Sequence, residues 1–253
     1  MTINSFINFF VFTCIILLSP VKLNADVSIG VRGDDTFGSV FYVVIGGFIT
    51  AQDQKELISN MADASAAGLR LAILGSEGGD LHAAMMMGRY LREHRFDTMV
   101  LPNSVCYSAC VFLLAAGIDK KVQGFVGIHR PYYTSGDPAL VSKSIKKTKI
   151  EVETFFDEMN IPIRLAEDMF SVDPTDMRIL SEEELKEYRL NSKDYVAQEA
   201  DAIDMIERLG VSREDYEAFL QDLNYTCKIF MGRSKLFKSC LDDVMKRHNL
   251  NLR

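Results

Sequence analysis

The sequence predicts an α/β fold, in which short buried strands alternate with helices. Two short segments, residues 40–45 and 69–74, are rich in Val, Ile and Leu and are apolar at nearly every position, as buried parallel strands are. Each is followed by a turn and then by a segment with helical periodicity. With 253 residues, 48% of them hydrophobic, the chain can bury a full core. The repeated order of strand and helix indicates a parallel sheet with right-handed crossovers.

The individual elements follow from local signals. Residues 26–39 are rich in Gly and Asp, so we expect an irregular lead-in there. Thr50, with Asp53 three residues later, predicts a capped helix start, and Ser181 with Glu184 predicts another. Asp173–Asp176 reads as a turn. The expected strands are 40–45, 69–74, 98–101 and one or two within 122–128, and the expected helices are 51–66, 81–94, 108–116, 137–159, 161–170 and several beyond residue 191.

The N-terminal segment is typical of a secretory signal. Residues 7–18 form an apolar run shorter than a bilayer span, and Ser19-Pro20 and Ala25 follow it, so we expect cleavage after Ala25. The segment before the run has no Lys or Arg, whereas Lys22 lies after it. A retained membrane anchor and a buried N-terminal helix therefore stay open as alternatives. With a cleaved signal the protein would be exported, to the periplasm or beyond.

Cysteine usage fits an exported chain. Loss of residues 1–25 removes Cys14 and leaves four cysteines, an even number that permits two disulfides. We expect the local pairs Cys106–Cys110 and Cys227–Cys240, because the members of each pair are close in sequence. For the first pair the alternative is two small buried thiols beside a turn.

Charge and composition exclude some functions. The formal net charge is −7 and no tract is dense in Lys or Arg, which argues against a nucleic-acid partner. Beyond one Cys-x3-Cys, no Cys/His group has the spacing of a metal site, so we expect no metal. We also expect no cofactor.

Three segments carry residues suited to acyl transfer. A serine hydroxyl becomes a useful nucleophile when a base removes its proton, and backbone amides must face the oxygen that becomes negative. Ser108 begins the apolar segment 108–116, and His129 follows the strand that ends near residue 128. Gly78 and Gly79 lie between a predicted strand and helix, and Ala109 directly follows the serine. The amides of these three residues are candidates for an oxyanion hole.

The segment 43–131 resembles the Clp protease proteolytic subunit and the wider Clp/crotonase superfamily. The pieces that carry the resemblance are Ser76-Glu77-Gly78-Gly79, Ser108–Gly117 and Ile128-His129-Arg130-Pro131, in that order. The resemblance implies a spiral of repeated ββα-type units, a homo-oligomer, a peptide or protein substrate, Ser108 as nucleophile and His129 as base. It places the third catalytic residue at Asp173, counted back from Ser181, with Asp176 as the alternative.

Three features depart from the family pattern. Glu77 replaces a proline and puts a carboxylate near the oxyanion hole, Cys106 and Cys110 flank the serine, and the chain beyond Asn191 has no counterpart. We therefore divide the chain into a signal (1–25), an α/β domain (26–190) and a helical C-terminal extension (191–253).

These features lead to three functional hypotheses. The first is an exported, ATP-independent serine peptidase-like hydrolase. A catalytically inactive module that binds a peptide or a partner is the alternative. Crotonase-like chemistry on an acyl thioester ranks last, because that substrate is scarce outside the cell.

Overall fold

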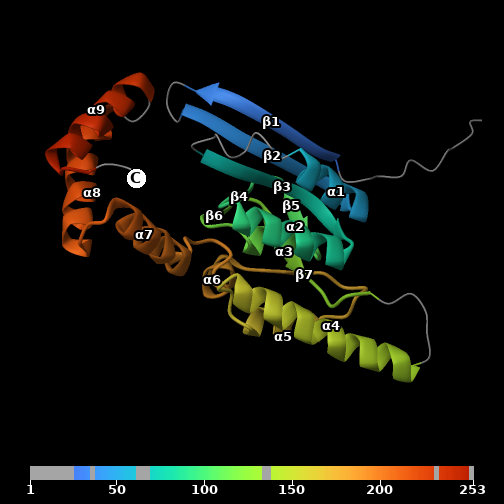
Figure 1. Ribbon diagram of the computed structural model, residues 1–253. Coiled ribbons are helices and arrows are strands. Elements are labelled where there is room, and N and C mark those ends of the chain that lie inside the picture. Colours follow the sequence, from blue (N-terminus) through green and yellow to red (C-terminus); the bar gives the residue numbers. More distant parts are fainter. Residues whose placement is uncertain (1–25, 35–37, 61–68, 133–137, 231–233, 251–253) are drawn as a thin grey trace, which may run out of the picture.

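The protein has an α/β fold built on a mixed, mostly parallel sheet (Figure 1). A computed structural model describes residues 26–34, 38–60, 69–132, 138–230 and 234–250. The expected signal (1–25) and the expected end of the first helix (61–66) lie outside these residues. Within them, eight strands form one sheet: β1 (Asp26–Asp34), β2 (Gly38–Ile49), β3 (Leu69–Gly79), β4 (Asp97–Val100), β5 (Val105–Tyr107), β6 (Lys120–Val122), β7 (Phe125–Ile128) and β8 (Arg178–Ile179).

The sheet forks at β3. The first half of β3 pairs with β4 through residues 71–74, and β4 in turn pairs with β6. Farther along, Ser76 of β3 pairs with Cys106 of β5, and β5 pairs with β7. All of these pairings are parallel, whereas β1 and β8 join β2 and β7 in the antiparallel sense. The carboxyl ends of β3, β5 and β7 therefore meet at one edge, where ligands collect in such sheets.

Several strand predictions need correction. The lead-in expected at residues 26–39 is wrong for residues 26–34, which form β1 and pair with β2 along the whole length of β1, whereas residues 35–37 lie outside the described residues. β2 continues past Gly46-Gly47 to Ile49, with an irregularity between Gly47 and Phe48. The glycine turn expected after residue 74 is in fact the end of β3, because Gly78 and Gly79 still pair with β2. β5, three residues long, is absent from the predicted strands.

The helices agree more closely with the sequence. The capping boxes predicted at Thr50–Asp53 and Ser181–Glu184 are both confirmed. The third predicted helix begins at Cys110 rather than Ser108. The helices are α1 (Ala51–Ser59), α2 (Leu81–Glu93), α3 (Cys110–Ala115), α4 (Pro138–Glu158), α5 (Arg164–Ser171), α6 (Glu182–Glu187), α7 (Tyr195–Leu209), α8 (Arg213–Cys227), η2 (Lys228–Phe230) and α9 (Ser234–Arg247).

The main core holds α2 and α3 between the sheet and α4. Phe112 of α3 stacks on Phe156 of α4, with ring centroids 5.1 Å apart, and Phe155 meets Phe112 edge-on. Gly88 lets α4 approach α2, since a Cβ there would lie 2.9 Å from the Phe155 ring. The exposed N-terminal half of α4 extends away from the sheet (Figure 1).

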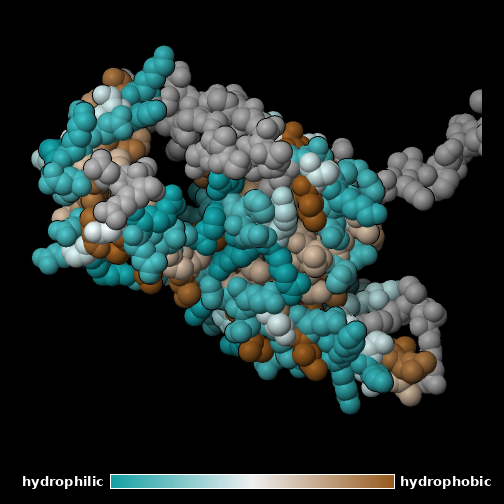
Figure 2. Space-filling model, viewed as in Figure 1, coloured by the Kyte–Doolittle hydropathy of each residue, from teal (hydrophilic) through white to brown (hydrophobic). Residues whose placement is uncertain are grey.

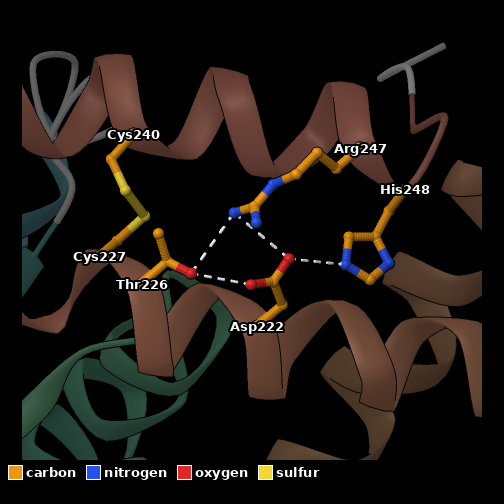
Figure 3. Close-up of a disulfide and its surroundings, with 6 residues drawn as sticks. All are labelled: Asp222, Thr226, Cys227, Cys240, Arg247 and His248. Atoms are coloured by element: carbon orange, nitrogen blue, oxygen red, sulfur yellow. Dashed lines mark hydrogen bonds and ion pairs between the residues drawn. A yellow bond between two sulfur atoms is a disulfide. The ribbon is translucent and has the colours of Figure 1, made fainter.

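The C-terminal helices have a hydrophobic cluster of their own, separate from the main core. Its buried members are Leu209, Phe219, Cys227, Cys240, Val244 and Leu250. The Cys227–Cys240 disulfide joins α8 to α9, as predicted. Figure 3 shows, beside it, the Asp222 carboxylate between Thr226 and His248, and Arg247 forms an ion pair with the same carboxylate. These bonds fasten the last turn of α9 to α8.

The surface gives two further observations. The face seen in Figure 2 is largely hydrophilic, and its apolar residues appear in small separate groups. No helix in the described ranges is long and apolar enough to span a bilayer.

Candidate active site

Ser108 lies in a tight connection between a strand and a helix. β5 ends at Tyr107 and α3 begins at Cys110, so only two residues join them. Ser108 has a positive φ of 54°, which a residue with a side chain rarely adopts. Its amide donates to the Gly127 carbonyl of β7 (2.9 Å), and its carbonyl accepts from the Val111 amide (3.1 Å). This geometry sets the serine at the carboxyl edge of the sheet, and strained turns between a strand and a helix carry the nucleophile in α/β-hydrolases.

A disulfide closes this connection. Cys106 of β5 is bonded to Cys110 of α3, with the two Cα atoms 5.1 Å apart, and both residues are fully buried. The predicted pairing is confirmed, and the alternative of two buried thiols is excluded. The bridge ties the strand before Ser108 directly to the helix after it.

The two glycines of β3 bring that strand against the serine. Gly78 has a φ of 108°, and a Cβ placed on it would lie 2.7 Å from the Ser108 Cβ and 3.1 Å from the Ala109 nitrogen. Gly79 has a φ of 141°, and its Cβ would lie 2.2 Å from the Ile49 carbonyl oxygen. Neither position has room for a side chain, so the sequence Gly-Gly is required by both conformation and space.

The amides proposed for the oxyanion hole differ in availability. The Gly78 N–H donates to the Ser76 hydroxyl (3.0 Å), which in turn donates to the Gly47 carbonyl (2.6 Å). The Gly78 amide is thus already engaged. The Ala109 amide donates to no described residue, and both Ala109 and Gly79 line the cavity at the serine. The Ala109 amide is therefore better placed than that of Gly78.

His129 follows the last residue of β7 and lines the same cavity as Ser108. Its Nδ1 is 2.8 Å from the Arg130 carbonyl oxygen. A carbonyl can only accept, so Nδ1 carries the proton and Nε2 is left as the acceptor. No hydrogen bond joins Ser108 to His129 in this structure.

Neither aspartate predicted as the third member contacts the histidine. Asp173 is exposed, and its carboxylate accepts from the Thr175 amide (3.0 Å), the Thr175 hydroxyl (2.8 Å) and Arg130 (3.2 Å). The hydrogen bonds from Thr175 lower the pKa of Asp173. Asp176 lies in the same turn and forms no hydrogen bond or ion pair with His129. Asp173 thus has the turn-capping role common for aspartate.

The cavity around Ser108 has a volume of about 520 Å³ and an anionic mouth. Its charged lining residues are Glu77 and Asp80, both exposed, and neither Lys nor Arg lines it. Apart from Ser108 and His129, the remaining wall is mostly apolar and includes the exposed rings of Phe48 and Tyr132 and the buried Phe112 and Met169. In the described part of the chain, no group of three or more His, Cys, Asp or Glu could hold a metal ion.

Comparison with known proteins does not assign the chain to a family. No family model matches the chain, and a search of curated protein sequences finds no significant match.

Sequence reasoning missed two contributors to this site. The Ser76 hydroxyl holds the Gly78 amide, and the Arg130 carbonyl holds the His129 ring. A serine two residues before a glycine is a signal for a local bond of the first kind. The backbone carbonyl next to the histidine gives no signal in the sequence.

Proposed function

We propose that the protein is a serine hydrolase of the peptidase type. The observation that carries the proposal is Ser108, held at positive φ at the carboxyl edge of the sheet, in one cavity with His129 and the unbonded Ala109 amide. The nucleophile and the oxyanion donor then come from the β5–α3 connection, and the base comes from the end of β7. This is the arrangement that acyl transfer requires.

The chemistry follows from the hydrogen bond at His129. With Nδ1–H donated to the Arg130 carbonyl, Nε2 can accept the Ser108 proton as Oγ attacks the substrate carbonyl. The same proton passes to the leaving amine, and water then hydrolyses the acyl-enzyme. A backbone carbonyl replaces the usual aspartate in orienting the ring. Substrate binding would bring Ser108 and His129 to hydrogen-bonding distance, since catalytic hydrogen bonds are often long in free enzymes.

The anionic mouth supports a preference in substrate. Glu77 and Asp80 would attract a lysine or arginine side chain, and the apolar wall would hold its hydrophobic neighbours. The same Glu77 would oppose an oxyanion if it turned inward. We propose peptides with a basic residue close to the cleaved bond.

The resemblance to the Clp/crotonase superfamily extends this proposal. It includes the ββα spiral, a homo-oligomer, and an α/β domain to residue 190 followed by a helical appendage. The two disulfides fit an oxidising compartment, and we propose export to the periplasm.

A serine-reactive fluorophosphonate probe tests the activity. The purified protein should be labelled, Ser108→Ala should not, and His129→Ala should be labelled about a hundredfold more slowly. Ser104→Ala, four residues away, is the matched control and should be labelled like the wild type. Labelling that survives Ser108→Ala would overturn the proposal.

A peptide- or partner-binding module is the second candidate. The absence of a Ser108–His129 hydrogen bond favours it. It would be supported if the probe labels nothing while a fluorescent basic peptide binds equally to wild type and Ser108→Ala.

A further inference from the structure

A second cavity, of about 350 Å³, lies at the opposite edge of the sheet from Ser108. Lys120, which lines it, is the first residue of β6, whereas Ser108 and His129 follow the last residues of β5 and β7. The intervening pairings, β6–β4–β3–β5–β7, are all parallel. The amino end of β6 and the carboxyl ends of β5 and β7 therefore lie at opposite edges. The two cavities share no lining residue.

The wall of this cavity comes from two segments that run side by side. The Lys120 amide donates to the Ser192 carbonyl (3.1 Å), and the Asp194 amide donates to the Ile118 carbonyl (2.8 Å). Residues 192–194 are thereby fixed along the start of β6, between α6 and α7 (Figure 1). The cavity is part of the folded framework and does not depend on a loose loop.

The lining is strongly cationic. Its charged members are Lys120, Lys186, Arg189 and Lys193 against one carboxylate, Asp194. That carboxylate is already engaged, because it accepts from Arg92, from Asn160 (3.0 and 3.2 Å) and from the Ala197 amide (3.0 Å). Of the wall cations, Lys193 pairs with Asp119 (3.9 Å), whereas Lys120, Lys186 and Arg189 form no ion pair within the described residues.

Two polar groups of the wall lack the partners that burial normally demands. Lys120 is only 2% exposed, and its ammonium bonds to a single described group, the Gly117 carbonyl (3.0 Å). Burial lowers the pKa of Lys120 to about 8. The Ser192 hydroxyl is buried without any hydrogen bond to the described chain. A buried polar group without a partner is costly, so both groups would gain from a ligand that accepts hydrogen bonds.

We propose that this cavity binds a phosphate group, free or as a small phosphate monoester. A doubly charged anion matches the excess of positive charge better than a carboxylate does. Its several oxygens could accept from Lys120, Arg189 and Ser192, all of which line the cavity. The site is independent of the proposed hydrolase activity.

Calorimetric titration of inorganic phosphate into the purified full chain, at constant ionic strength, tests the proposal. We expect one saturable site per chain. Lys120→Met and Lys186→Gln should each weaken binding at least tenfold. Lys186 is exposed, so its variant should keep the fold even if Lys120→Met does not. Lys121→Met is the matched control, because the side chain of Lys121 points to the other face of β6 and should leave affinity unchanged.

Two results would overturn the site: no saturable heat with phosphate, or equal heat with chloride at the same ionic strength. The proposal would also be contradicted if Lys120→Met, Lys186→Gln and Lys121→Met all bound phosphate with the same affinity. A parallel titration with glycerol 2-phosphate distinguishes the sources. Tighter binding than inorganic phosphate assigns the site to phosphate monoesters, and equal or weaker binding assigns it to free phosphate.

Discussion

Gly78 sets the distance between β3 and the turn that carries Ser108. Its positive φ and the contact a Cβ would make with the Ser108 Cβ, at 2.7 Å, leave no room for substitution. Gly78→Ala should destabilise the protein by about 1–3 kcal/mol and reduce fluorophosphonate labelling of Ser108 at least tenfold. Chemical denaturation and labelling rates measure the two effects.

Gly75→Ala is the matched control for that variant. Gly75 lies in the same strand, but a Cβ added to it would meet no atom within 4 Å, and its φ is not positive. The substitution should change stability and labelling little. Equal losses in both variants would show that the strand tolerates no alanine, and the specific role of Gly78 would then be wrong.

At the level of single residues, the sequence predicts what depends on neighbours in the chain. One cavity is lined by Ser108, His129, Gly79 and Ala109 because all four lie at the ends of strands. Gly79 ends a strand, Ser108 and His129 each directly follow one, and Ala109 is next to Ser108. The prediction for Asp173 depends on counting along a resemblance, whereas its real partners, Thr175 and Arg130, depend on how the turn folds. Hydrogen bonds to backbone carbonyls, such as that of His129, have no residue type to mark them.

Among the elements, the α8–α9 pair relies most on covalent support. Its hydrophobic cluster is small, and the disulfide spans thirteen positions of sequence. The double variant Cys227→Ala/Cys240→Ala should lose about 3 kcal/mol in this pair. Hydrogen exchange should then rise in α8 and α9, whereas amides of α2 serve as an internal control and should keep their protection. An equal rise in α2 would mean that the two clusters unfold as one.

Strand prediction succeeds where a strand is long or mostly apolar and fails where it is very short or rich in glycine and aspartate. β3 and β4 lie inside the sheet, and their apolar residues mark them in the sequence. β1 alternates Val27, Ile29 and Val31 with polar residues and glycine, and its glycines and aspartates are equally typical of a loop. β5, with three residues, is too short to show a period.

In the whole molecule, Asp194 connects parts far apart in the sequence. It caps α7 and accepts from Arg92 of α2 and from Asn160, while its side chain is 3% exposed. Asp194→Asn retains a capping side chain but removes the charge, so it should cost about 3 kcal/mol at pH 7 by leaving Arg92 unpaired. Asp201→Asn, which breaks the exposed pair of α7 with Arg95, should cost under about 1 kcal/mol.

The contribution of Asp194 to the stability of the fold should depend on pH. Burial raises its pKa, but hydrogen bonds from Asn160, the Ala197 amide and Arg92 outweigh this and hold the pKa below 3.8. The unfolded chain therefore takes up the proton first, so the stabilisation is present above about pH 4 and is lost as the pH falls. The free energies of unfolding of wild type and Asp194→Asn, measured by denaturation, should converge at acid pH. A constant difference down to about pH 2 would contradict the role of the charge.

The fold class is predictable for the whole molecule, but the pairing order is not. Alternating strands and helices indicate an α/β sheet, whereas the fork of β3 between β4 and β5 depends on contacts between distant segments. The polar cavity at Lys120 escapes prediction for the same reason, since Lys120, Arg189 and Ser192 meet only in the folded chain.

The Ser108 turn is complete only after the disulfide between Cys106 and Cys110 has formed. Disulfides rarely persist in reducing compartments, so a newly made chain there carries two thiols, and its Ser108 turn lacks the disulfide. A preparation made in a reducing cytosol would begin in that open form. Oxidation would then complete the Ser108 turn, so the redox state of the compartment would decide whether the strand before Ser108 is tied to the helix after it.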